Sequence, residues 1–403
     1  MLRGNRYRIY PKKEQKIILE KHFGSCRFVF NKLLNIKQIF YDKFRATISK
    51  SELEKHLVIF RELFPWLEDV NAQSLQQANK DLDNAFQRFF SGLGGYPKKK
   101  SKKFHHYSFQ VPQDYKINLS TSELYLPKIG WIKVKMHRNL VYPSLFSGII
   151  KHRDNSETFR TLTVSKTPTG KYYVSILTDD LVDNPPVVEY SKATLLGIDV
   201  GIKTFAALSS GEKIEHPKFL KFSLQKLKCL QKRVSKKVIG SNNRRKAVKK
   251  LAIIHELISN QRHDFQHKAS KRLISENQAI AVETLNVRGL MRNHKLAQAI
   301  GDSAWYSFVL KLSYKAEQYG KTILKIGMFE PSSKTCNVCG FHNSELTLDV
   351  RDWLCPECRT MHDRDINAAI NIKKFALITA GTAGRACGLA LNREGNEAGS
   401  PSL

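Results

Sequence analysis

The chain has 403 residues, of which 41% are hydrophobic and 26% charged. This length and balance are typical of a globular protein with two or more domains, and they exclude a disulfide-stabilised miniprotein, a fibrous protein and a disordered chain. Lysine and arginine number 67 against 36 acidic residues, a net charge of +31 that predicts a polyanionic partner. No stretch reaches the roughly 18 apolar residues of a membrane helix and Met1 leads into charged sequence, so we expect a cytoplasmic protein with no membrane partner.

The N-terminal half combines strand and helix patterns. Alternation over residues 6–10 predicts a strand that Pro11 ends. Apolar residues then recur at helical spacing over 12–45 and 51–90, which predicts a helical block. A glycine-rich break and a lysine-rich loop at 98–103 follow. Further strands are expected at 123–126, 131–136, 161–164 and 172–177, and we expect the first strand to join them in a β-barrel.

The C-terminal half has the alternation of an α/β domain. Buried strands are predicted over 194–200, 204–208, 279–283 and 322–326, and helices within 220–275, over 303–319 and from 363 to about 378. The predicted domains are a discontinuous β-barrel (1–11 and 97–185), a helical insertion (12–96), a linker (186–193), a discontinuous α/β domain (194–330 and 360–378), a cysteine ribbon (331–359) and a disordered tail (379–403).

Four of the seven cysteines form a metal-binding pattern. Cys336 and Cys339 make one pair, Cys355 and Cys358 make a second, and 15 residues separate the pairs. This spacing is typical of a zinc ribbon, in which four thiolates surround one tetrahedral Zn²⁺ and leave no open position for chemistry. We therefore predict one structural zinc ion.

Three acidic residues occupy positions typical of a catalytic site. Asp199 and Glu283 end apolar strands and Asp365 lies at a helix start, so a ribonuclease-H-like α/β domain would bring them together. Three carboxylates that meet need cations, and two Mg²⁺ ions are the usual arrangement for phosphodiester hydrolysis. Each acid alone has a simpler explanation, since Asp363 or Asp365 suits a helix N-cap and the others suit a turn and a strand end. Together, on so cationic a chain, they favour a nuclease.

The positive charge is concentrated between the first two of these acids. Sixteen lysines and arginines lie between Lys221 and Arg272, against two acidic residues. A solvent-exposed helix face usually mixes both signs, and a membrane-surface helix needs a continuous apolar stripe, which this segment lacks. We therefore predict phosphate contacts here. The residues chosen for this role are Arg244, Arg245, Lys249 and Lys250.

Taken together, these motifs resemble the TnpB family of RNA-guided endonucleases, which insertion sequences encode and which are related to type V CRISPR effectors. The resemblance extends over nearly the whole chain, including its N-terminal half. It rests chiefly on four segments: Leu196 to Ala206 around Asp199, Val282 to Leu285 around Glu283, Pro331 to Cys336 before the ribbon, and His362 to Ile372 around Asp365.

The resemblance implies a fold, a mechanism and partners. The N-terminal β-barrel becomes a wedge domain with a helical recognition insertion, and the C-terminal domain a RuvC nuclease of RNase H-like fold that contains the zinc ribbon. Asp199, Glu283 and Asp365 map to the catalytic acids that hold two Mg²⁺ ions, which leaves Asp363 as the N-cap. A guide RNA from the transposon end would direct cleavage of double-stranded DNA beside a short motif. Gln76, on the predicted recognition helix, is a candidate to read a base edge, with an ordinary exposed residue as the alternative.

Two other functions remain open on the sequence. The first is a guided repressor that binds DNA without cutting it, and such a protein would be expected to have lost at least one acid, whereas all three are present. The second is a transposase that uses the same acids. The ribbon between the second and third acids and the N-terminal barrel favour guided cleavage. A nuclease of this kind would be cytoplasmic and associate with the nucleoid when bound to DNA.

Overall fold

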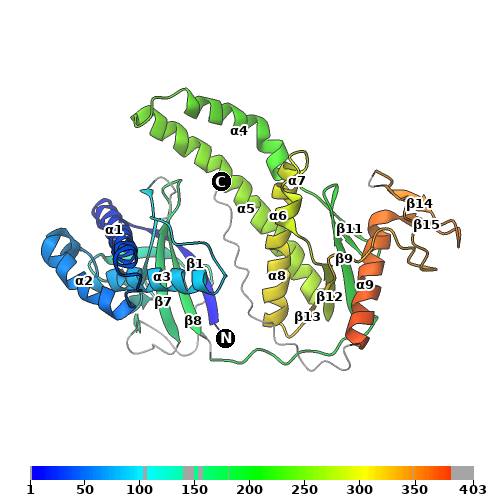
Figure 1. Ribbon diagram of the computed structural model, residues 1–403, viewed down its shortest axis with the longest axis horizontal. Helices are drawn as coiled ribbons and strands as arrows, with labels where there is room; N and C mark the ends of the chain where they lie inside the picture. Colours follow the sequence, from blue (N-terminus) through cyan, green and yellow to red (C-terminus); the bar gives the residue numbers. More distant parts are fainter. Residues whose placement is uncertain are drawn as a thin grey trace. The chain divides into compact units, whose positions relative to one another are not determined.

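The computed structural model describes residues 2–102, 107–138, 149–152, 158–179, 181–347 and 349–382 (Figure 1). The chain forms two compact units, and the boundary between them falls after Asp183. None of the described helices is both long and apolar enough to cross a membrane. Most of the predicted tail, residues 383–403, lies outside the described residues, whereas 379–382 continue the last helix and are not part of a tail.

The first unit is built on an eight-stranded sheet in which every neighbouring pair is antiparallel. The four later strands expected from the sequence are confirmed as β4, β5, β7 and β8, while three short ones (β2, β3 and β6) were missed. The order along the sheet is β2-β7-β8-β1-β5-β4-β3-β6. The strands are β1 (Leu2–Tyr10), β2 (Tyr107–Val111), β3 (Lys116–Asn118), β4 (Glu123–Leu126), β5 (Gly130–Lys135), β6 (Ile149–Lys151), β7 (Phe159–Lys166) and β8 (Tyr172–Asp179).

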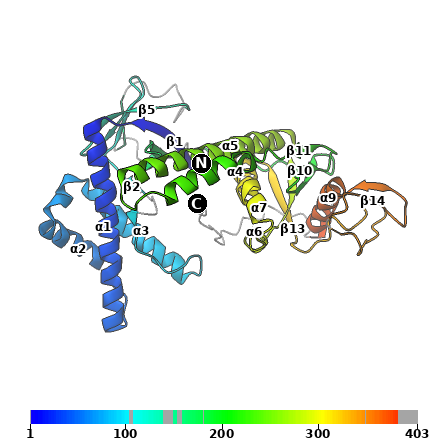
Figure 2. The same cartoon turned by 90° about the horizontal axis from the view of Figure 1, so that it is seen from above.

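Three α-helices and a 3₁₀ turn make up the helical insertion (Figure 2). They are α1 (Lys13–Phe44), α2 (Lys50–Leu63), η1 (Pro65–Asp69) and α3 (Ala72–Phe90). The second helical stretch, expected over 51–90, is therefore broken in two. Pro65 begins the 3₁₀ turn and the Asn71 side chain caps α3 by accepting a hydrogen bond from the backbone of Gln73, at 3.2 Å. One apolar core joins these helices to the sheet.

The second unit contains a five-stranded mixed sheet of order β11-β10-β9-β12-β13. The three strands β9, β12 and β13 run parallel, and β10 and β11 are antiparallel additions at one edge. Four of these strands were predicted, and only the three-residue β11 was not. The strands are β9 (Leu195–Val200), β10 (Thr204–Leu208), β11 (Lys213–Glu215), β12 (Ala279–Glu283) and β13 (Thr322–Ile326).

Helices cover both faces of this sheet (Figure 1). Alternate residues of β9 and β12 divide between two apolar cores, as expected for strands buried on both sides. Leu196, Ile198, Ile280 and Val282 pack with α5 (Asn242–Glu276) and α8 (Trp305–Gln318). Leu195, Ala279 and Ala281 pack with α9 (Arg364–Thr382) on the opposite face. The remaining elements are α4 (Phe219–Ser235), α6 (Val287–Leu290), α7 (Ala297–Ser303) and the ribbon strands β14 (Asp352–Leu354) and β15 (Met361–Asp363).

The segment that we expected to be a linker, 186–193, makes specific contacts within the second unit. The Val188 N–H donates to the Gly320 carbonyl at 2.8 Å, and Tyr190 packs against the core beneath α9. The detailed division into wedge, recognition and nuclease domains stays a prediction. The mixture of helices and sheets agrees with the expected fold class, and the closed barrel and the RNase H-like fold stay predictions.

Gly197 sets how closely α9 approaches the sheet. A Cβ atom at this position would lie 2.1 Å from the Ala369 carbonyl oxygen and 2.9 Å from the Lys373 backbone nitrogen. Both neighbours belong to the backbone of α9, which cannot yield as the end of a flexible side chain can. Only glycine therefore lets helix and strand approach this closely.

We predict that Gly197→Ala lowers the stability of the second unit by about 1–3 kcal/mol, because the added methyl group overpacks the contact with α9. Thermal unfolding measures this directly. Gly24→Ala is the matched control, since Gly24 lies inside α1 with nothing within 4 Å of its missing Cβ, and the change should stabilise α1 by about 0.5–1 kcal/mol. Equal unfolding temperatures for Gly197→Ala and the wild type would contradict this close packing.

Candidate nuclease site and zinc ribbon

Asp199 and Glu283 lie side by side on the sheet face that α9 covers. In the parallel pairing of β9 and β12, Ala281 is opposite Gly197 and Val282 opposite Ile198. The next pair in this register is Glu283 and Asp199. Because side chains alternate along a strand, Asp199 points to the same face as Gly197, which contacts α9. The two carboxylates therefore meet at the carboxyl ends of the strands.

Helix geometry places Asp365 next to these two acids. Ala369 contacts Gly197, and Asp365 lies four residues before Ala369, one turn nearer the start of α9. Asp199 lies two residues beyond Gly197 on the strand. From the Gly197–Ala369 contact, two residues forward along β9 lead to Asp199, and one turn back along α9 leads to Asp365. Asp365 therefore lies near Asp199 and Glu283, close enough for its charge to act on Asp199.

Burial and the two neighbouring acids oppose ionisation of Asp199. Burial raises the pKa of Asp199 well above its usual value, and the negative charges of Glu283 and Asp365 raise it further. Burial also raises the pKa of Glu283, against which the hydrogen bond donated by the Ser332 hydroxyl acts. A site with such mutual repulsion favours a cation.

Two arginines next to the acids were not anticipated from the sequence. Nη1 of Arg351 donates to Oδ1 of Asp365 at 2.9 Å. Arg364 is buried and its guanidinium donates to the Thr347 carbonyl at 2.6 Å. The charges of both lower the pKa of Asp199, without reversing the effects of burial and of the neighbouring carboxylates. Arg351 lies 14 residues from Asp365, in the ribbon, so no local pattern pointed to the pair.

Asp363 has a different role from Asp365. Its Oδ1 accepts hydrogen bonds from the backbone N–H groups of Asp365 and Ile366, at 3.1 and 3.0 Å, and its Oδ2 pairs with Lys213 at 2.5 Å. Burial opposes ionisation, but these contacts hold the pKa of Asp363 below its usual value. Asp363 caps α9, as the sequence analysis proposed for it.

The four ribbon cysteines form a compact cluster of sulfur atoms, and all four lie within 4.8 Å of one another. Sγ of Cys336 is 3.6 Å from that of Cys358, and Cys339 and Cys355 are separated by the same distance. A tetrahedron with Zn–S bonds of about 2.3 Å has edges of about 3.8 Å, so the spacing fits zinc. Gly340 follows the first pair with φ of 83°, which gives its turn a conformation that other residues rarely adopt. Within the described ranges, this is the one such compact group of ligand atoms.

Two asparagines of α9 join the ribbon to the nuclease site. Nδ2 of Asn371 donates to the carbonyls of Ser332 and Thr335, at 2.8 and 2.5 Å. Asn367 donates to the same Thr335 carbonyl and accepts from the Asn337 N–H, at 2.8 and 2.9 Å. The held segment carries Ser332, which bonds Glu283, and it leads directly into Cys336. One helix therefore positions both Asp365 and the ribbon.

The residues expected to contact nucleic acid are spread over both units. Gln76 is exposed on α3 in the first unit, and Arg245, Lys249 and Lys250 are exposed on α5 in the second. Arg244 is already engaged, since its Nη1 donates to the carbonyls of Val234 and Lys237 at 2.7 and 2.9 Å. The structure therefore gives Arg244 a clear internal role and leaves the other four side chains available to solvent.

An α/β unit with acidic residues at its strand ends and a cysteine ribbon is typical of a class of nucleases. Comparisons with known proteins point to the same class. The chain is 35% identical to "Putative RNA-guided DNA endonuclease" of Streptomyces pristinaespiralis, over 100% of this chain and 95% of that one. It is 29% identical to "Putative RNA-guided DNA endonuclease InsQ" of Escherichia coli K12, over 96% and 94%. The chain therefore belongs to the TnpB family of insertion-sequence-encoded, RNA-guided DNA endonucleases.

Family models and a solved structure give a consistent picture. Residues 179–294 match "Probable transposase", 305–372 match "Cas12f1-like, TNB domain" and 1–45 match "Helix-turn-helix domain". In this chain the last range forms β1 and α1. A solved Cas12f1–sgRNA–target DNA complex contains a chain of similar fold, with a TM-score of 0.53 and 14% identity over 93% of this chain and 98% of that one.

We predict that Asn371→Ala destabilises the second unit by about 1–3 kcal/mol, because it leaves the Ser332 carbonyl without its donor and removes one of the two donors to the Thr335 carbonyl. Thermal unfolding of the metal-loaded protein measures the loss. Asn260→Ala is the control, since Asn260 is exposed on α5 and its replacement should be neutral or slightly stabilising. If both variants unfold at the same temperature, the asparagine link does not hold the ribbon.

Proposed function

We propose that this chain cuts DNA at a site selected by a guide RNA, with Asp199, Glu283 and Asp365 as its catalytic acids. Family membership supports the reaction class. The observation that carries the residue assignment is the convergence of the three carboxylates, expressed in the raised pKa of Asp199. The strand order, with three parallel and two antiparallel strands, is consistent with an RNase H-like domain.

The donor set fits hard divalent cations. All three groups are carboxylates, the ligands that Mg²⁺ prefers, and their mutual repulsion is what a bound cation relieves. We propose that they hold two Mg²⁺ ions, which would activate a water molecule and stabilise the charge that develops on the phosphate. Repulsion among the acids thus becomes affinity for metal.

The chain's own residues orient these acids. Ser332 donates to Glu283, which fixes one carboxylate oxygen and leaves the other free. Arg351 holds Asp365 through a single oxygen, at 2.9 Å, in the same way. The cap that Asp363 provides fixes the first turn of α9, on which Asp365 lies. Glu283 and Asp365 are thus each held through one carboxylate oxygen, and the other oxygen would bind the cation.

We propose that the cysteine cluster binds one Zn²⁺ ion that supports the site indirectly. Zinc would close the ribbon that carries Arg351 and leads into the cap at Asp363. Only six residues, 359–364, separate Cys358 from Asp365. Binding of zinc would therefore order the ribbon and Asp365 together.

We propose that the partners are a guide RNA and double-stranded target DNA. The solved complex of similar fold contains a guide RNA and target DNA. The net charge of +31 suits both polyanions. Gln76, exposed on α3, is our candidate for reading a base of the motif beside the target.

We predict that each of the variants Asp199→Asn, Glu283→Gln and Asp365→Asn slows cleavage by about 10³-fold or more, because bound metal stabilises the transition state by several kcal/mol. Guide and target binding should be nearly unchanged. The assay is cleavage of supercoiled plasmid by the complex reconstituted with guide RNA and Mg²⁺.

Asp363→Asn is the matched control, since asparagine caps a helix as well as aspartate does and this variant should keep most activity. An inactive Asp363→Asn together with an active Asp365→Asn would reverse our assignment. Joined rather than cut strands among the products would indicate a transposase.

We predict that Cys355→Ser lowers bound zinc from about one ion per chain to well below one and also reduces cleavage. Atomic absorption on protein purified without chelator gives the zinc content. Cys229→Ser, which changes an exposed thiol on α4 outside the cluster, should leave zinc and cleavage unchanged. A wild-type protein without zinc would contradict the assignment of the ribbon.

A further inference from the structure

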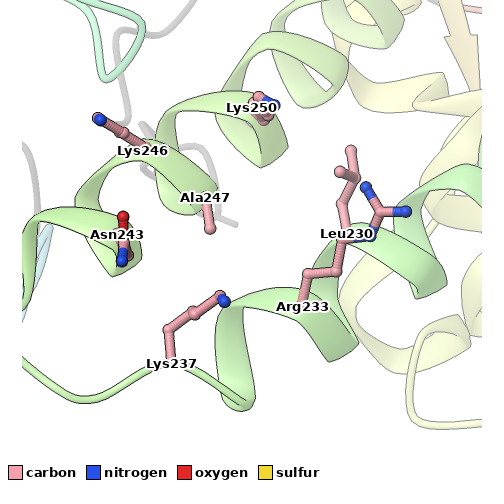
Figure 3. A pocket seen from close by; sticks show the side chains of 7 residues that line it. All are labelled: Leu230, Arg233, Lys237, Asn243, Lys246, Ala247 and Lys250. Carbon is pink, nitrogen blue, oxygen red and sulfur yellow. The ribbon is translucent and has the colours of Figure 1, made fainter.

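A groove between α4 and α5 is lined by four cationic side chains (Figure 3). Arg233 and Lys237 come from α4 and the turn that follows it, and Lys246 and Lys250 come from α5. Asn243 adds an amide at the start of α5, and the groove volume is about 430 Å³. The two helices form a hairpin and run side by side in both views (Figures 1 and 2).

Helical periodicity explains why these cations share one space. On α5, Asn243, Lys246 and Lys250 follow an i, i+3, i+7 pattern, which places them along one face. Arg233 lies in the last turn of α4, and Lys237 lies four positions later, in the turn that follows. Leu230 and Ala247 complete the lining, and a small apolar core holds the two helices together nearer their other ends.

Within the residues that the structure describes, no acidic side chain pairs with the cations of the groove. From Lys221 to His255 the sequence contains no aspartate or glutamate, and among the described residues none of the four cations forms an ion pair. Lys246 and Lys250 are like charges four residues apart on α5, an arrangement that destabilises a helix. A bound anion would reverse this cost.

Arg244 acts as the brace of the hairpin. Its guanidinium donates to two carbonyls at the end of α4, and its backbone N–H donates to the Ser241 side chain that caps α5, at 3.1 Å. It thus links the end of α4 and the turn that follows to the first turn of α5. Arg244 holds the ends of the two helices together, while none of the four groove cations has an ion-pair partner in the described part of the chain.

We propose that this groove binds the phosphodiester backbone of a nucleic-acid strand, with Arg233, Lys237, Lys246 and Lys250 as the contacts and Arg244 as a positioning residue. The proposal rests on the proposed function only for the nature of the ligand. Cations four residues apart on a helix are about 6 Å apart along its axis, which suits successive phosphates of one strand. The open groove offers no base-reading pocket, so binding should be independent of sequence.

A membrane surface is the alternative partner for a basic hairpin. Val238 and Ile239 at its turn are 77% and 86% exposed. Phe222 on α4 and Ile253 and Leu257 on α5 are also exposed, but they lie toward the other end of the hairpin. They do not join the turn residues into the apolar stripe that membrane binding through a helix face needs. The observations therefore favour nucleic acid, and anionic vesicles enter the test as the competing ligand.

The test compares two variants that lose the same charge. The groove variant carries Arg233→Gln, Lys237→Gln, Lys246→Gln and Lys250→Gln. The control variant carries Lys221→Gln, Lys226→Gln, Lys228→Gln and Lys271→Gln, four exposed residues of the same two helices that do not line the groove. Fluorescence anisotropy of the full chain, stripped of copurified nucleic acid, measures binding without divalent cations from about 50 to 200 mM salt. The probes are a labelled RNA strand, a DNA strand and a heteroduplex of about 20 nucleotides, and phosphatidylserine vesicles.

The groove variant should bind nucleic acid more weakly and flatten the log–log salt dependence by about 0.7–0.9 for each lost contact, so by up to about 3.6 for all four. The control variant should lose much less affinity. The affinity that the groove variant loses should be the same for two nucleic acids of unrelated sequence. The strand whose binding suffers more identifies RNA or DNA as the ligand. Lys237→Arg, Lys246→Arg and Lys250→Arg together should retain the wild-type slope, which shows that charge and not folding is measured.

Equal losses in the groove and control variants would overturn the proposal, because they would reflect net charge alone. Loss of vesicle binding with unchanged nucleic-acid binding would replace it with a membrane contact. Because the assay contains no divalent cation, it does not depend on cleavage. A chain that fails to cut but shows the expected difference refutes the proposed function alone, and a chain that cuts without that difference refutes the groove alone.

Discussion

The close approach of α9 to β9 at Gly197 is the constraint on which the rest of the second unit depends. It brings the backbone of α9 against the backbone of β9. The residue spacing of a helix and of a strand then determines which side chains lie next to each other before and after this contact. Toward the strand ends, Asp199, Glu283 and Asp365 come together. Farther along α9, Ile372 and Ala376 pack into the core on that face. The same contact therefore provides stability and positions the reactive groups.

Charge balance explains how such a site persists in the folded protein. Burial raises the pKa of Asp199, and the negative charges of Glu283 and Asp365 raise it further. Arg351 and Arg364 offset part of this repulsion; Arg351 lies in the ribbon, and Arg364 is the first residue of α9. Asn371 of α9 also donates to the Ser332 carbonyl, and the Ser332 hydroxyl donates to Glu283. The ribbon is thus a structural partner of the acids as well as a candidate metal site.

Much of this arrangement follows from local sequence patterns. Apolar strands that end in Asp199 and Glu283, the paired cysteines and the cap at Asp363 each have a short-range signature. Strands of three residues, such as β3, β6 and β11, are too short to show a period. Arg351, Ser332 and Asn371 were missed because their partners lie 14 to 49 residues away. Arg244 was assigned by charge alone, and nothing in the sequence indicated that its guanidinium caps a helix.

The central claim is that one contact between helix and strand builds a single divalent-cation site from three distant acids. Counting bound Mn²⁺ by electron paramagnetic resonance tests it most directly, because Mn²⁺ substitutes for Mg²⁺ at oxygen sites. We expect two Mn²⁺ ions per chain that Mg²⁺ displaces, and markedly weaker binding in Gly197→Ala although that variant retains every carboxylate. Unchanged Mn²⁺ binding in Gly197→Ala, or no binding in the wild type, would contradict the account.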